Sequence, residues 1–386
     1  MQREASIPRQ DWQDFNLRFR FGVGTSLHQP ASWVEEDNWR ENACYSLTTH
    51  EADVIAEATK DLHDLCLHTL DKVITAGNYG RELGIPDVAI PMIERSWKRR
   101  DPSLFGRFDL AYDGVSPPKM IEYNADYACL LLESSVLQYH WAVANQHPRQ
   151  FNNLHANLID HWEKAQMKLG FQTLHMTADF SETECVQTLD YMAQTAESAG
   201  LTVRKIDLAK IGWDDNKKVF FDDQDQDIQT LFKLKGWEGM MASDFAPYLA
   251  IDPETIQVIE PSWKMLLASK AFMATLWKEN RNHPNLLPTF HTVDPFGDTF
   301  VRKPVWGAMG EGVSIAIDDN RARVEAGLDY ESTDIYQQYQ PLPVFDGKSA
   351  LVCSWMVGNN PAGIGIREEK GNIVGGKSVF VPHYLK

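Results

Sequence analysis

Polar residues between positions 105 and 124 have the types and spacing of a metal site. The segment alternates polar and apolar residues on either side of a Gly- and Pro-rich turn, which predicts a β-hairpin. Because side chains alternate along a strand, Arg107 and Asp109 share one face, and Glu122 shares a face with Asn124. The turn could bring Asp109, Glu122 and Asn124 together as an all-oxygen set, which Mg²⁺ prefers when it is held with nucleotide phosphates. Arg107 would then supply positive charge to a transferring phosphoryl group or an oxyanion.

The same alternation also suits a different kind of hairpin. Polar residues at every second position are ordinary on a strand that has one face in water. From spacing alone, a solvated polar face is the more ordinary interpretation, and the magnesium site is the alternative hypothesis.

A glycine-rich loop at 303–314 (KPVWGAMGEGVS) is the second candidate for chemistry. Gly307 and Gly312 have the spacing of a phosphate-binding P-loop, but Val313 stands where that motif has its lysine. The residues that follow alternate as a strand does, so the loop joins two strands and does not open a helix. A P-loop is therefore excluded. Two interpretations remain: a flexible flap whose backbone N–H groups cover phosphates, with Lys303 at its base, or an ordinary glycine-rich turn.

Three further polar residues have both a functional and an ordinary interpretation. Lys270 lies on or near a predicted helix, where a lysine is usually solvated. Gln337 ends a predicted strand shortly before Pro341, and this segment could be a hinge that hydrogen-bonds adenine or simply the edge of a sheet. Arg367 lies at the end of another strand, where a surface ion pair is the ordinary outcome.

The chain is strongly acidic, which limits its partners. It has 37 Lys and Arg against 54 Asp and Glu, a formal net charge of −17, and no basic cluster denser than 98–100 (KRR). Such a charge repels a phosphate backbone, so no nucleic-acid partner is expected. Acidity suits a site for metals or polyamines. Asp179, Glu182 and Glu184 could attract a polyamine, although acids at a helix start more often serve the helix dipole.

Length and composition indicate a folded protein with several lobes. At 386 residues, with 43% hydrophobic and 11% aromatic residues, the chain can form two or three domains or lobes. No apolar run is long enough for a membrane span, and the N-terminus lacks the apolar core of a signal peptide, so we expect a cytoplasmic protein with no membrane partner. The five cysteines are odd in number and lack a CxxC, which favours neither a disulfide framework nor a zinc site.

The first elements that position these residues can be predicted from capping and periodicity. Thr48 and Glu51 form an S/T-x-x-E capping pattern, and apolar residues continue at helical spacing to Ile74. A long helix is therefore expected from position 48. Further helices are expected at 130–146 and 151–169.

A βαβ unit is predicted next. Residues 172–177 and 201–208 are the expected strands. Ser181 and Glu184 form a second capping pattern at the start of the helix between them, and Gly200 ends that helix.

The C-terminal part is dominated by strands. A helix is expected at 263–277, while residues 1–45 have weak periodicity and are expected to be irregular. Helices combined with mixed strands predict an α+β fold with more than one lobe. The C-terminal strand candidates are 299–306, 313–317, 335–339, 350–357, 362–367 and 373–374.

Several segments, taken together, closely resemble the glutathionylspermidine synthase family. The resemblance is to its synthetase half, and particularly to short stand-alone members described as acid–amine ligases, and it covers positions 39–383. In ordered combination these segments are far more specific than any single motif. They are DLHDLCLHTLDKVI (61–74), PSLFGRFDLAYDG (102–114), IEYNAD (121–126), LFKLKGWEGMM (231–241), SWKMLLASKAFMATLW (262–277), NHPNLLPTF (282–290), VRKPVWG (301–307), IYQQYQPLP (335–343), CSWMV (353–357) and PAGIGIRE (361–368).

The resemblance implies an ATP-grasp architecture and an ATP-dependent carboxylate–amine ligase. Such enzymes activate a carboxylate as an acyl phosphate with Mg·ATP, and an amine then attacks to form an amide. The resemblance thus implies ATP with one or two Mg²⁺ ions, a small-molecule or peptide carboxylate, and an amine, with a polyamine as one candidate. Within the matched region, 46–386, it implies a βαβ lobe (pre-ATP-grasp-like) near 170–260 and a nucleotide-binding lobe near 261–386.

The resemblance also assigns roles to individual residues. Asp109, Glu122 and Asn124 match the family's magnesium ligands. Arg107 and Arg367 match its catalytic arginines, which would steady the phosphoryl group.

Nucleotide and substrate positions follow from the same resemblance. Asp126 and Cys129 are the candidates for contact with the acid or the amine. The positions that match ATP-binding residues are Arg107, Phe108, Asp109, Lys270, Lys303, Gly310, Gln337 and Ile373.

Two departures from the family pattern keep other functions open. Ala308 stands in the flap where family members carry an arginine, and 127–130 (YACL) replaces a run of small hydroxyl residues that helps to hold the acid. The first change motivates an alternative, a Mg·ATP-binding protein of this fold with weak or lost ligase activity. A second alternative is a partner-binding protein without catalysis.

Overall fold

A computed structural model of the chain describes most of its length. Helices, antiparallel strands and parallel strands all occur, so the fold is α+β with several sheets, as the sequence predicts. The described residues are 1–10, 12, 38–79, 81–147, 149–251, 256–317, 320–323, 333–376 and 378–386.

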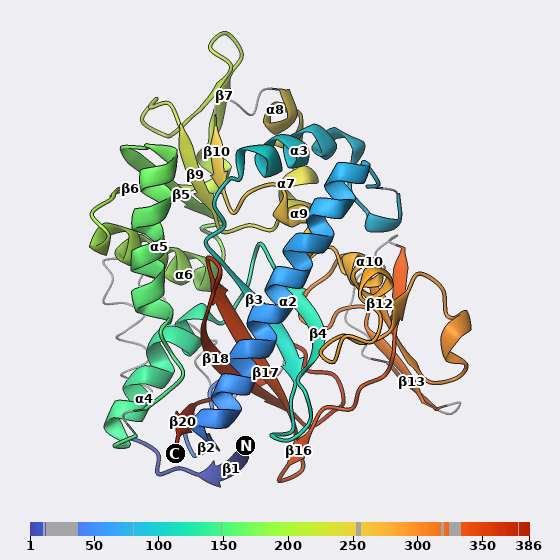
Figure 1. Ribbon diagram of the computed structural model, residues 1–386. Helices are drawn as coiled ribbons and strands as arrows, with labels where there is room; N and C mark the ends of the chain where they lie inside the picture. The colour runs from blue at the N-terminus through green and yellow to red at the C-terminus, as the bar shows by residue number, and fades with distance from the viewer. Residues whose placement is uncertain are drawn as a thin grey trace.

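The central sheet carries the predicted hairpin, and the long helix α2 (Thr49–Ala76) crosses one of its faces (Figure 1). The helix begins at the predicted capping box, in which the Thr48 hydroxyl accepts from the Glu51 N–H and the Glu51 carboxylate accepts from the Thr48 N–H. In order across the sheet, the strands are β19 (Val379–Val381), β18 (Asn360–Glu369), β17 (Lys348–Val357), β3 (Phe105–Ala111) and β4 (Lys119–Asn124), with β16 (Val344–Phe345) paired to β17.

The alternation along β3 separates an apolar face from a polar one. Phe108 and Leu110 belong to the core cluster that also contains Ile55 of α2. Arg107 and Asp109 alternate with them and therefore point to the opposite side of the sheet. Both polar residues are buried, so the solvated-face interpretation of this hairpin is wrong for the β3 strand.

A second sheet holds the βαβ unit. β5 (Thr173–Ala178) and β6 (Thr202–Asp207) are parallel and are joined by α6 (Thr183–Ser198), which confirms the prediction. β9 (Thr230–Lys233) and β10 (Gln257–Ile259) continue the sheet beyond β5.

The second predicted capping box is wrong. In this described segment the cap position of α6 is Glu182, and no side chain caps the helix. The Ser181 hydroxyl donates to the Asp179 carboxylate at 2.6 Å instead. The Asp179 carboxylate also accepts from the Ser181 N–H at 3.0 Å, so it closes a local turn just before the helix.

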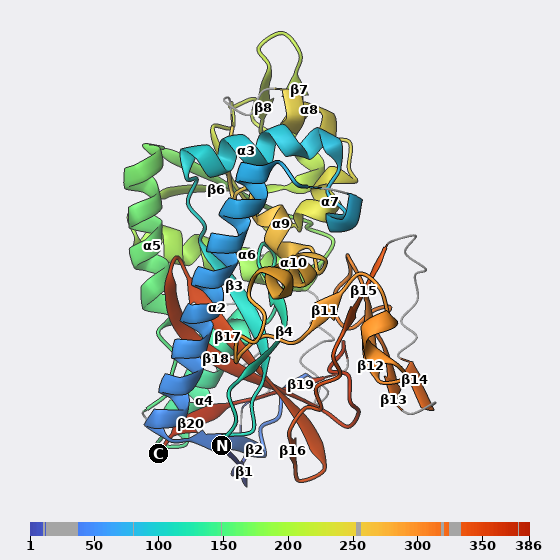
Figure 2. The same cartoon turned by 45° about the vertical axis from the view of Figure 1, so that its right-hand side comes forward.

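A third, antiparallel sheet carries the glycine-rich loop. The loop joins β12 to β13, as predicted, and α10 (Phe272–Glu279) lies between this sheet and α2 (Figure 2). In order, the strands are β11 (Thr289–Phe290), β15 (Asp334–Gln337), β12 (Phe300–Pro304), β13 (Ser314–Ile317) and β14 (Asn320–Arg323).

The single helix expected at 263–277 is two helices. α9 (Lys264–Ala268) ends before α10 begins, and Lys270 lies in the break between them. The backbone N–H of Lys270 donates to the carbonyl of Val305, at the end of β12, at 3.0 Å. In a continuous helix, this N–H group would donate to a carbonyl of the preceding turn. The periodicity of the sequence cannot reveal that it bonds to a distant strand instead.

Two other expectations change in detail. The strand expected at 373–374 is a loop. The helix expected at 130–146 is a π-helical turn at Glu133–Leu137 followed by α4 (Gln138–Ala144), whereas α5 (Leu154–Leu169) matches its prediction.

The chain ends meet in a small sheet. β1 (Gln2–Ala5), β2 (Ala43–Leu47) and β20 (His383–Leu385) form it, so residues 1–45 are not wholly irregular, and 11 and 13–37 lie outside the described residues. Among the described helices, none is both long and apolar enough to cross a bilayer. The remaining elements are α3 (Ile90–Arg99), β7 (Gly212–Asp214), β8 (Val219–Phe221), α7 (Trp237–Met241), α8 (Ala246–Ile251) and short 3₁₀ turns at Arg81–Leu83, Asp87–Ala89, Leu208–Lys210 and Asp294–Phe296.

Candidate active site

The hairpin brings together the three residues predicted to hold magnesium. Asp109 pairs directly with Glu122, and Arg107 pairs with Asn124, across the β3–β4 ladder. The side-chain Nδ2 of Asn124 donates to Glu122 Oε1 at 3.1 Å and to Asp109 Oδ2 at 3.5 Å. Register alone therefore puts the two carboxylates and the amide on one face.

This donor set fits Mg²⁺. Over the described ranges, the structure has no group of three or more His, Cys, Asp or Glu side chains that could hold a metal by themselves. Asp109 and Glu122 supply two carboxylates. The amide N–H of Asn124 faces them in this structure, so rotation of that amide would turn its oxygen toward a bound ion. Mg²⁺ is commonly held by one or two carboxylates together with substrate phosphates and water, so an incomplete protein shell of oxygen ligands suits it.

Arg107 is locked beside the hairpin carboxylates. Its guanidinium donates to both oxygens of Asp109, at 2.7 and 2.9 Å, and to the carbonyl of Cys129 at 2.6 Å. Burial by itself would lower the pKa of Arg107, but the Asp109 carboxylate outweighs burial and raises it. The arginine is therefore a permanent positive charge in a fixed orientation.

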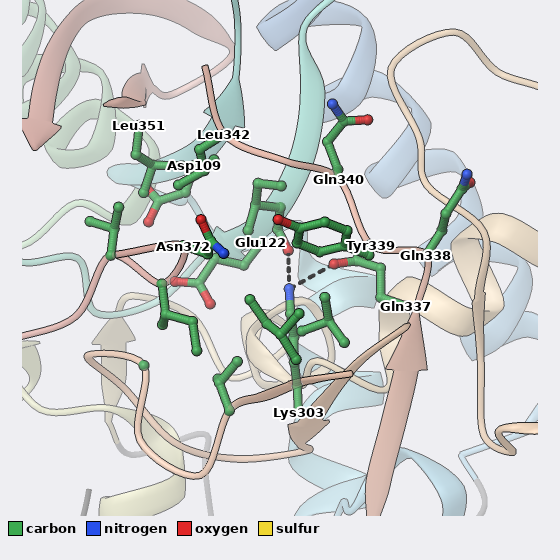
Figure 3. A pocket seen from close by; sticks show the side chains of 17 residues that line it. Asp109, Glu122, Lys303, Gln337, Gln338, Tyr339, Gln340, Leu342, Leu351 and Asn372 are labelled. Atoms are coloured by element: carbon green, nitrogen blue, oxygen red, sulfur yellow. Dashed lines mark hydrogen bonds between the residues drawn. The ribbon is translucent and has the colours of Figure 1, made fainter. Parts of the chain in front are cut away.

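Two lysines from separate elements meet the same hairpin. Lys303 of β12 donates to the carbonyl of Ile121 at 2.8 Å and to the side chain of Gln337 at 2.7 Å (Figure 3). Lys270, from the break between α9 and α10, donates to the carbonyl of Gly307, and its Nζ lies 4.0 Å from Glu122 Oε2.

These charges set the ionisation of the hairpin carboxylate and the lysine. Burial would raise the pKa of Glu122, but Lys270 and Lys303 outweigh it and lower the pKa to about 2. Burial lowers the pKa of Lys303 to about 8, with the Glu122 carboxylate opposing that shift. Glu122 is therefore an anion at neutral pH, as a metal ligand must be.

A pocket opens between the central sheet and the third sheet. Asp109, Glu122 and Lys303 lie in it together, and Gln337 stands at the start of a segment that passes along its edge (Figure 3). The pocket thus combines a charged end with an apolar body, as sites for a nucleotide do. Its full lining is Asp109, Ile121, Glu122, Val301, Lys303, Gly310, Val313, Ile315, Gln337, Gln338, Tyr339, Gln340, Leu342, Leu351, Asn372, Ile373 and Val374.

The glycine-rich loop closes onto this pocket. Gly310 has a φ of +77°, and a Cβ added there would lie 3.2 Å from Ile373 Cγ2. A side chain at this position would meet both backbone strain and a close neighbour, which explains the glycine. Arg367 donates to the carbonyl of Gly375 at 2.7 Å and so holds the loop that carries Ile373.

Arg107 and three other predicted site residues, Phe108, Arg367 and Cys129, line neither this pocket nor the second one described below. Phe108 is fully buried on the α2 side of the sheet and stacks on Tyr123 with ring centroids 3.8 Å apart, so its side chain supports the strand. Arg367 does not line the pocket, but the loop that it holds does, through Ile373. Cys129 contributes its carbonyl to Arg107, and burial raises the pKa of its thiol to about 12.

A second pocket lies on the other side of Glu122 and Lys270. It contains Asp126 of the predicted substrate residues, whereas Asp179, Glu182 and Glu184 are absent from the described lining of both pockets. The lining is Glu122, Tyr123, Asn124, Ala125, Asp126, Tyr127, Gly236, Trp237, Glu238, Ala268, Lys270, Trp306, Gly307, Ala308 and Glu311.

Sequence reasoning missed several residues of these pockets. Trp237 and Glu238 lie in a segment noted only for its resemblance, and Glu311 lies in the glycine-rich loop. Asn372 has no local signal at all. These residues come from segments far apart in the chain, so no spacing rule connects them.

Comparison with known proteins identifies a family for this chain. The sequence profile described as "Glutathionylspermidine synthase preATP-grasp" matches residues 3–386. A candidate acid–amine ligase of Haemophilus influenzae is 36% identical over 378 residues, which cover 94% of this chain and 95% of that protein. The bifunctional glutathionylspermidine synthetase/amidase of Escherichia coli is 27% identical over 371 residues, covering 88% of this chain and 58% of that protein.

Two more distant proteins are also similar to this chain. Trypanothione synthetase of Crithidia fasciculata is 27% identical over 84% of this chain and 54% of its own length, so the chain spans little more than half of these longer relatives. The solved structure of a glutathione synthetase-like effector of Globodera pallida shares the fold, with a TM-score of 0.56 at 9% identity, over 99% of this chain and 100% of the other. On the profile match and the 36% identity, the chain belongs to the glutathionylspermidine synthase family.

Proposed function

We propose that this protein is an ATP-dependent carboxylate–amine ligase of the ATP-grasp type. The observation that carries the proposal is that Glu122 lines both pockets. A nucleotide in the first pocket would then present its γ-phosphate beside the second, where an acid and an amine can reach it. Family membership and the similarity to the candidate acid–amine ligase of Haemophilus influenzae support the reaction class.

The reaction has two steps. A carboxylate oxygen attacks the γ-phosphorus of ATP and ADP leaves, which forms an acyl phosphate. The amine nitrogen then attacks the acyl carbon, phosphate leaves, and the nitrogen loses a proton to give the amide. Positioning and electrostatics supply most of the rate in phosphoryl transfer, so fixed charges matter more than covalent catalysis.

Each charged residue of the site has a place in this scheme. Asp109, Glu122 and Asn124 would hold Mg²⁺, which neutralises phosphate charge when it is bound. Lys303 and Lys270 would face the phosphates from the side of the third sheet. Arg107, locked to Asp109, would stabilise the phosphoryl group and later the tetrahedral intermediate.

Other parts of the chain would contribute without meeting the reacting atoms. Arg367 would hold the loop that carries Ile373 against the nucleotide. The glycine-rich loop would exclude water, which would otherwise hydrolyse the acyl phosphate.

The second pocket supports a cationic amine as the acceptor. Glu238 and Glu311 are acidic, and Trp306 adds aromatic surface. Acidic groups beside aromatic faces favour an alkylammonium ion. A polyamine is therefore the proposed amine class, and a small molecule or peptide the proposed acid. A cytoplasmic location is part of this proposal.

A second function is favoured by one observation. Ala308, which is exposed at the second pocket, has no side chain that could reach a phosphate. A protein with this loop could bind Mg·ATP and turn over weakly. A partner-binding protein without a nucleotide is the less supported alternative, because the charged end of the first pocket is intact.

ADP release tests the proposal. Purified protein with Mg·ATP should release ADP only when both an acid and an amine are supplied from a panel of short peptides, glutathione and polyamines. The Asp109→Ala variant is the negative control. ATP-dependent thermal stabilisation without release in any mixture would favour the weakly active nucleotide-binding protein, and no stabilisation by Mg·ATP would favour the partner-binding protein.

A further inference from the structure

Asp126 lines the second pocket, but its carboxylate already has hydrogen-bond and ion-pair partners within the protein. Its Oδ2 accepts a hydrogen bond from the backbone N–H of Trp237 at 2.6 Å and lies 3.5 Å from Nζ of Lys233. The Asp126 side chain is only 7% exposed. A carboxylate with two donors on one oxygen and so little exposed surface is held mainly by the protein.

Lys233 is a fully buried charge at the end of β9. Its ammonium has three neighbours: the Asp126 carboxylate, the carbonyl of Lys235 at 2.8 Å, and the ring of Trp237, whose centroid is 4.5 Å away. The side chain is 0% exposed. Asp126 is the counter-ion that this ammonium contacts, and a buried charge without a counter-ion is strongly unfavourable.

Trp237 is the piece that the buried pair holds in place. Its indole Nε1 donates to the carbonyls of Glu260 and Pro261, both at 3.1 Å, while its backbone N–H donates to Asp126. Trp237 also begins α7, and the next residue, Glu238, lines the second pocket. Movement of the Trp237 backbone would therefore move Glu238.

The pair connects two parts of the molecule that the reaction needs together. Asp126 follows the metal hairpin, two residues after Asn124, the last residue of β4. Lys233 ends a strand of the parallel sheet that contains the βαβ unit. The ion pair therefore fixes the position of Glu238, in the wall of the second pocket, relative to the hairpin carboxylates.

From this geometry we propose that Asp126 is a positioning residue rather than a substrate ligand. With Lys233 it pins Trp237 and thereby fixes Glu238 in the wall of the pocket that receives the amine. This assignment deepens the proposed ligase function and rests on it for the identity of the pocket. It separates Asp126 from the residues that contact the reactants.

The first test measures hydrogen–deuterium exchange and needs no substrate. In Asp126→Asn, the asparagine oxygen can still accept from Trp237, but Lys233 loses its counter-ion, so amides in 234–242 should exchange about tenfold faster than in the unchanged protein. The double variant Asp126→Asn with Lys233→Met removes the buried charge, so exchange should return toward the unchanged value. Equal exchange in Asp126→Asn and the unchanged protein would overturn the proposal.

The second test separates positioning from contact with the amine. With glutathione and spermidine as the probe pair, Asp126→Asn should raise the KM for spermidine about tenfold while the affinity for Mg·ATP stays the same. The double variant should recover most of that loss. If Asp126 bound the amine directly, the double variant would stay as impaired as Asp126→Asn, and that result would overturn the assignment.

A matched control comes from the same lobe. Asp190 is a buried carboxylate of α6 that pairs with Lys205 of β6 and lines neither pocket in the described structure. Asp190→Asn should reduce stability without changing exchange in 234–242 or the KM for spermidine. If the unchanged protein does not turn over the probe pair, the ligase proposal fails for that pair, and the exchange comparison still decides whether Asp126 and Lys233 hold Trp237.

Discussion

Lys303 of β12 donates a hydrogen bond to the side chain of Gln337 on the neighbouring strand β15, at 2.7 Å. The two residues are diagonal partners in the ladder, since Lys303 pairs with Ile335 and Gln337 pairs with Val301. Gln337 also contacts Thr289 at 3.4 Å. This chain of contacts across three strands holds the ammonium at the charged end of the first pocket. Among the described residues it forms no carboxylate salt bridge, so its charge is available to a phosphate.

Lys303→Met should weaken Mg·ATP binding about tenfold or more, because a charge-assisted hydrogen bond contributes about 1.5–3 kcal/mol. Isothermal titration with Mg·ATP measures the loss. Arg302→Met is the matched control, since Arg302 neighbours Lys303 in β12 but pairs with Asp334 and lines neither pocket in the described structure. Equal affinities for Lys303→Met and the unchanged protein would remove Lys303 from the nucleotide site.

Asp109→Asn and Glu122→Gln should each raise the Mg²⁺ concentration needed for half-maximal ADP release. Each keeps the shape of the side chain but removes an anionic ligand, and we expect the maximal rate to fall about 100-fold or more. The control is Asp113→Asn, because Asp113 lies in the turn of the same hairpin and accepts only from N–H and O–H groups of that turn. An unchanged Mg²⁺ dependence in both site variants would contradict the metal assignment.

Ala308→Arg should increase the rate of ADP release at saturating Mg·ATP. The exposed position 308 borders the second pocket, and a guanidinium there could add one charge-assisted contact in the transition state, an effect of about tenfold or more. Ala308→Met controls for added bulk without charge. If the arginine variant and the unchanged protein turn over equally, the missing arginine does not limit this enzyme.

The buried pair Glu260–Lys264 should dominate stability near the start of β3. The two charges are 2.7 Å apart, both 1% exposed, and Glu260 also accepts from the backbone N–H groups of Leu104 and Phe105. Lys264→Met would leave the buried Glu260 carboxylate without its counter-ion. We expect it to lower the free energy of unfolding, measured by urea titration, by about 3–5 kcal/mol.

A double variant and a surface pair make that test specific. Glu260→Gln combined with Lys264→Met should cost less than Lys264→Met alone, because no charge stays buried. Lys60→Met removes an exposed pair with Asp64 and should change stability by about 0.5 kcal/mol or less. A double variant less stable than Lys264→Met would argue against an ionic origin of the loss.

Two buried histidines should make the protein sensitive to acid. Burial lowers the pKa of His63 to about 4 and that of His383 to about 3. In the unfolded chain both titrate near pH 6.5, so below that pH the unfolded state binds more protons than the folded state. The stability contribution is complete above about pH 6.5 and falls as pH decreases toward 4, by about 1.4 kcal/mol per pH unit for each histidine.

Urea unfolding at pH 7.5 and pH 5.5 checks this dependence. His63→Gln should lose less stability between the two values than the unchanged protein does, since one proton uptake is removed. His68→Gln, at an exposed position of the same helix, should behave as the unchanged protein does. An unaltered pH dependence in His63→Gln would show that the histidine does not contribute.

Local patterns determined the parts of the site that lie on one hairpin. The alternation from Arg107 to Asn124 predicts which side chains share a face, and the observed register confirms it. The capping box at Thr48 and the βαβ unit are confirmed for the same reason, because both depend on residues close in sequence. The second capping box is wrong because α6 begins at Thr183 with Glu182 at its cap position, one residue later than the pattern predicts.

Burial and long-range contacts were decided only by the tertiary structure. The sequence predicts a helix through Lys270, but a contact with Val305 breaks that helix and lets the lysine reach Glu122. Lys264 lies within the predicted helix 263–277, and only the structure shows that it is a buried partner of Glu260.

The second pocket shows most clearly what sequence patterns cannot predict. Trp237, Glu238 and Glu311 meet the hairpin although they are far from it in the sequence. By itself, the sequence identified three charged residues that line the first pocket, Asp109, Glu122 and Lys303, through periodicity and family resemblance. Only the folded chain decided how that pocket adjoins the second, because contacts between distant segments depend on how whole sheets pack and not on the spacing of residues along one strand or helix.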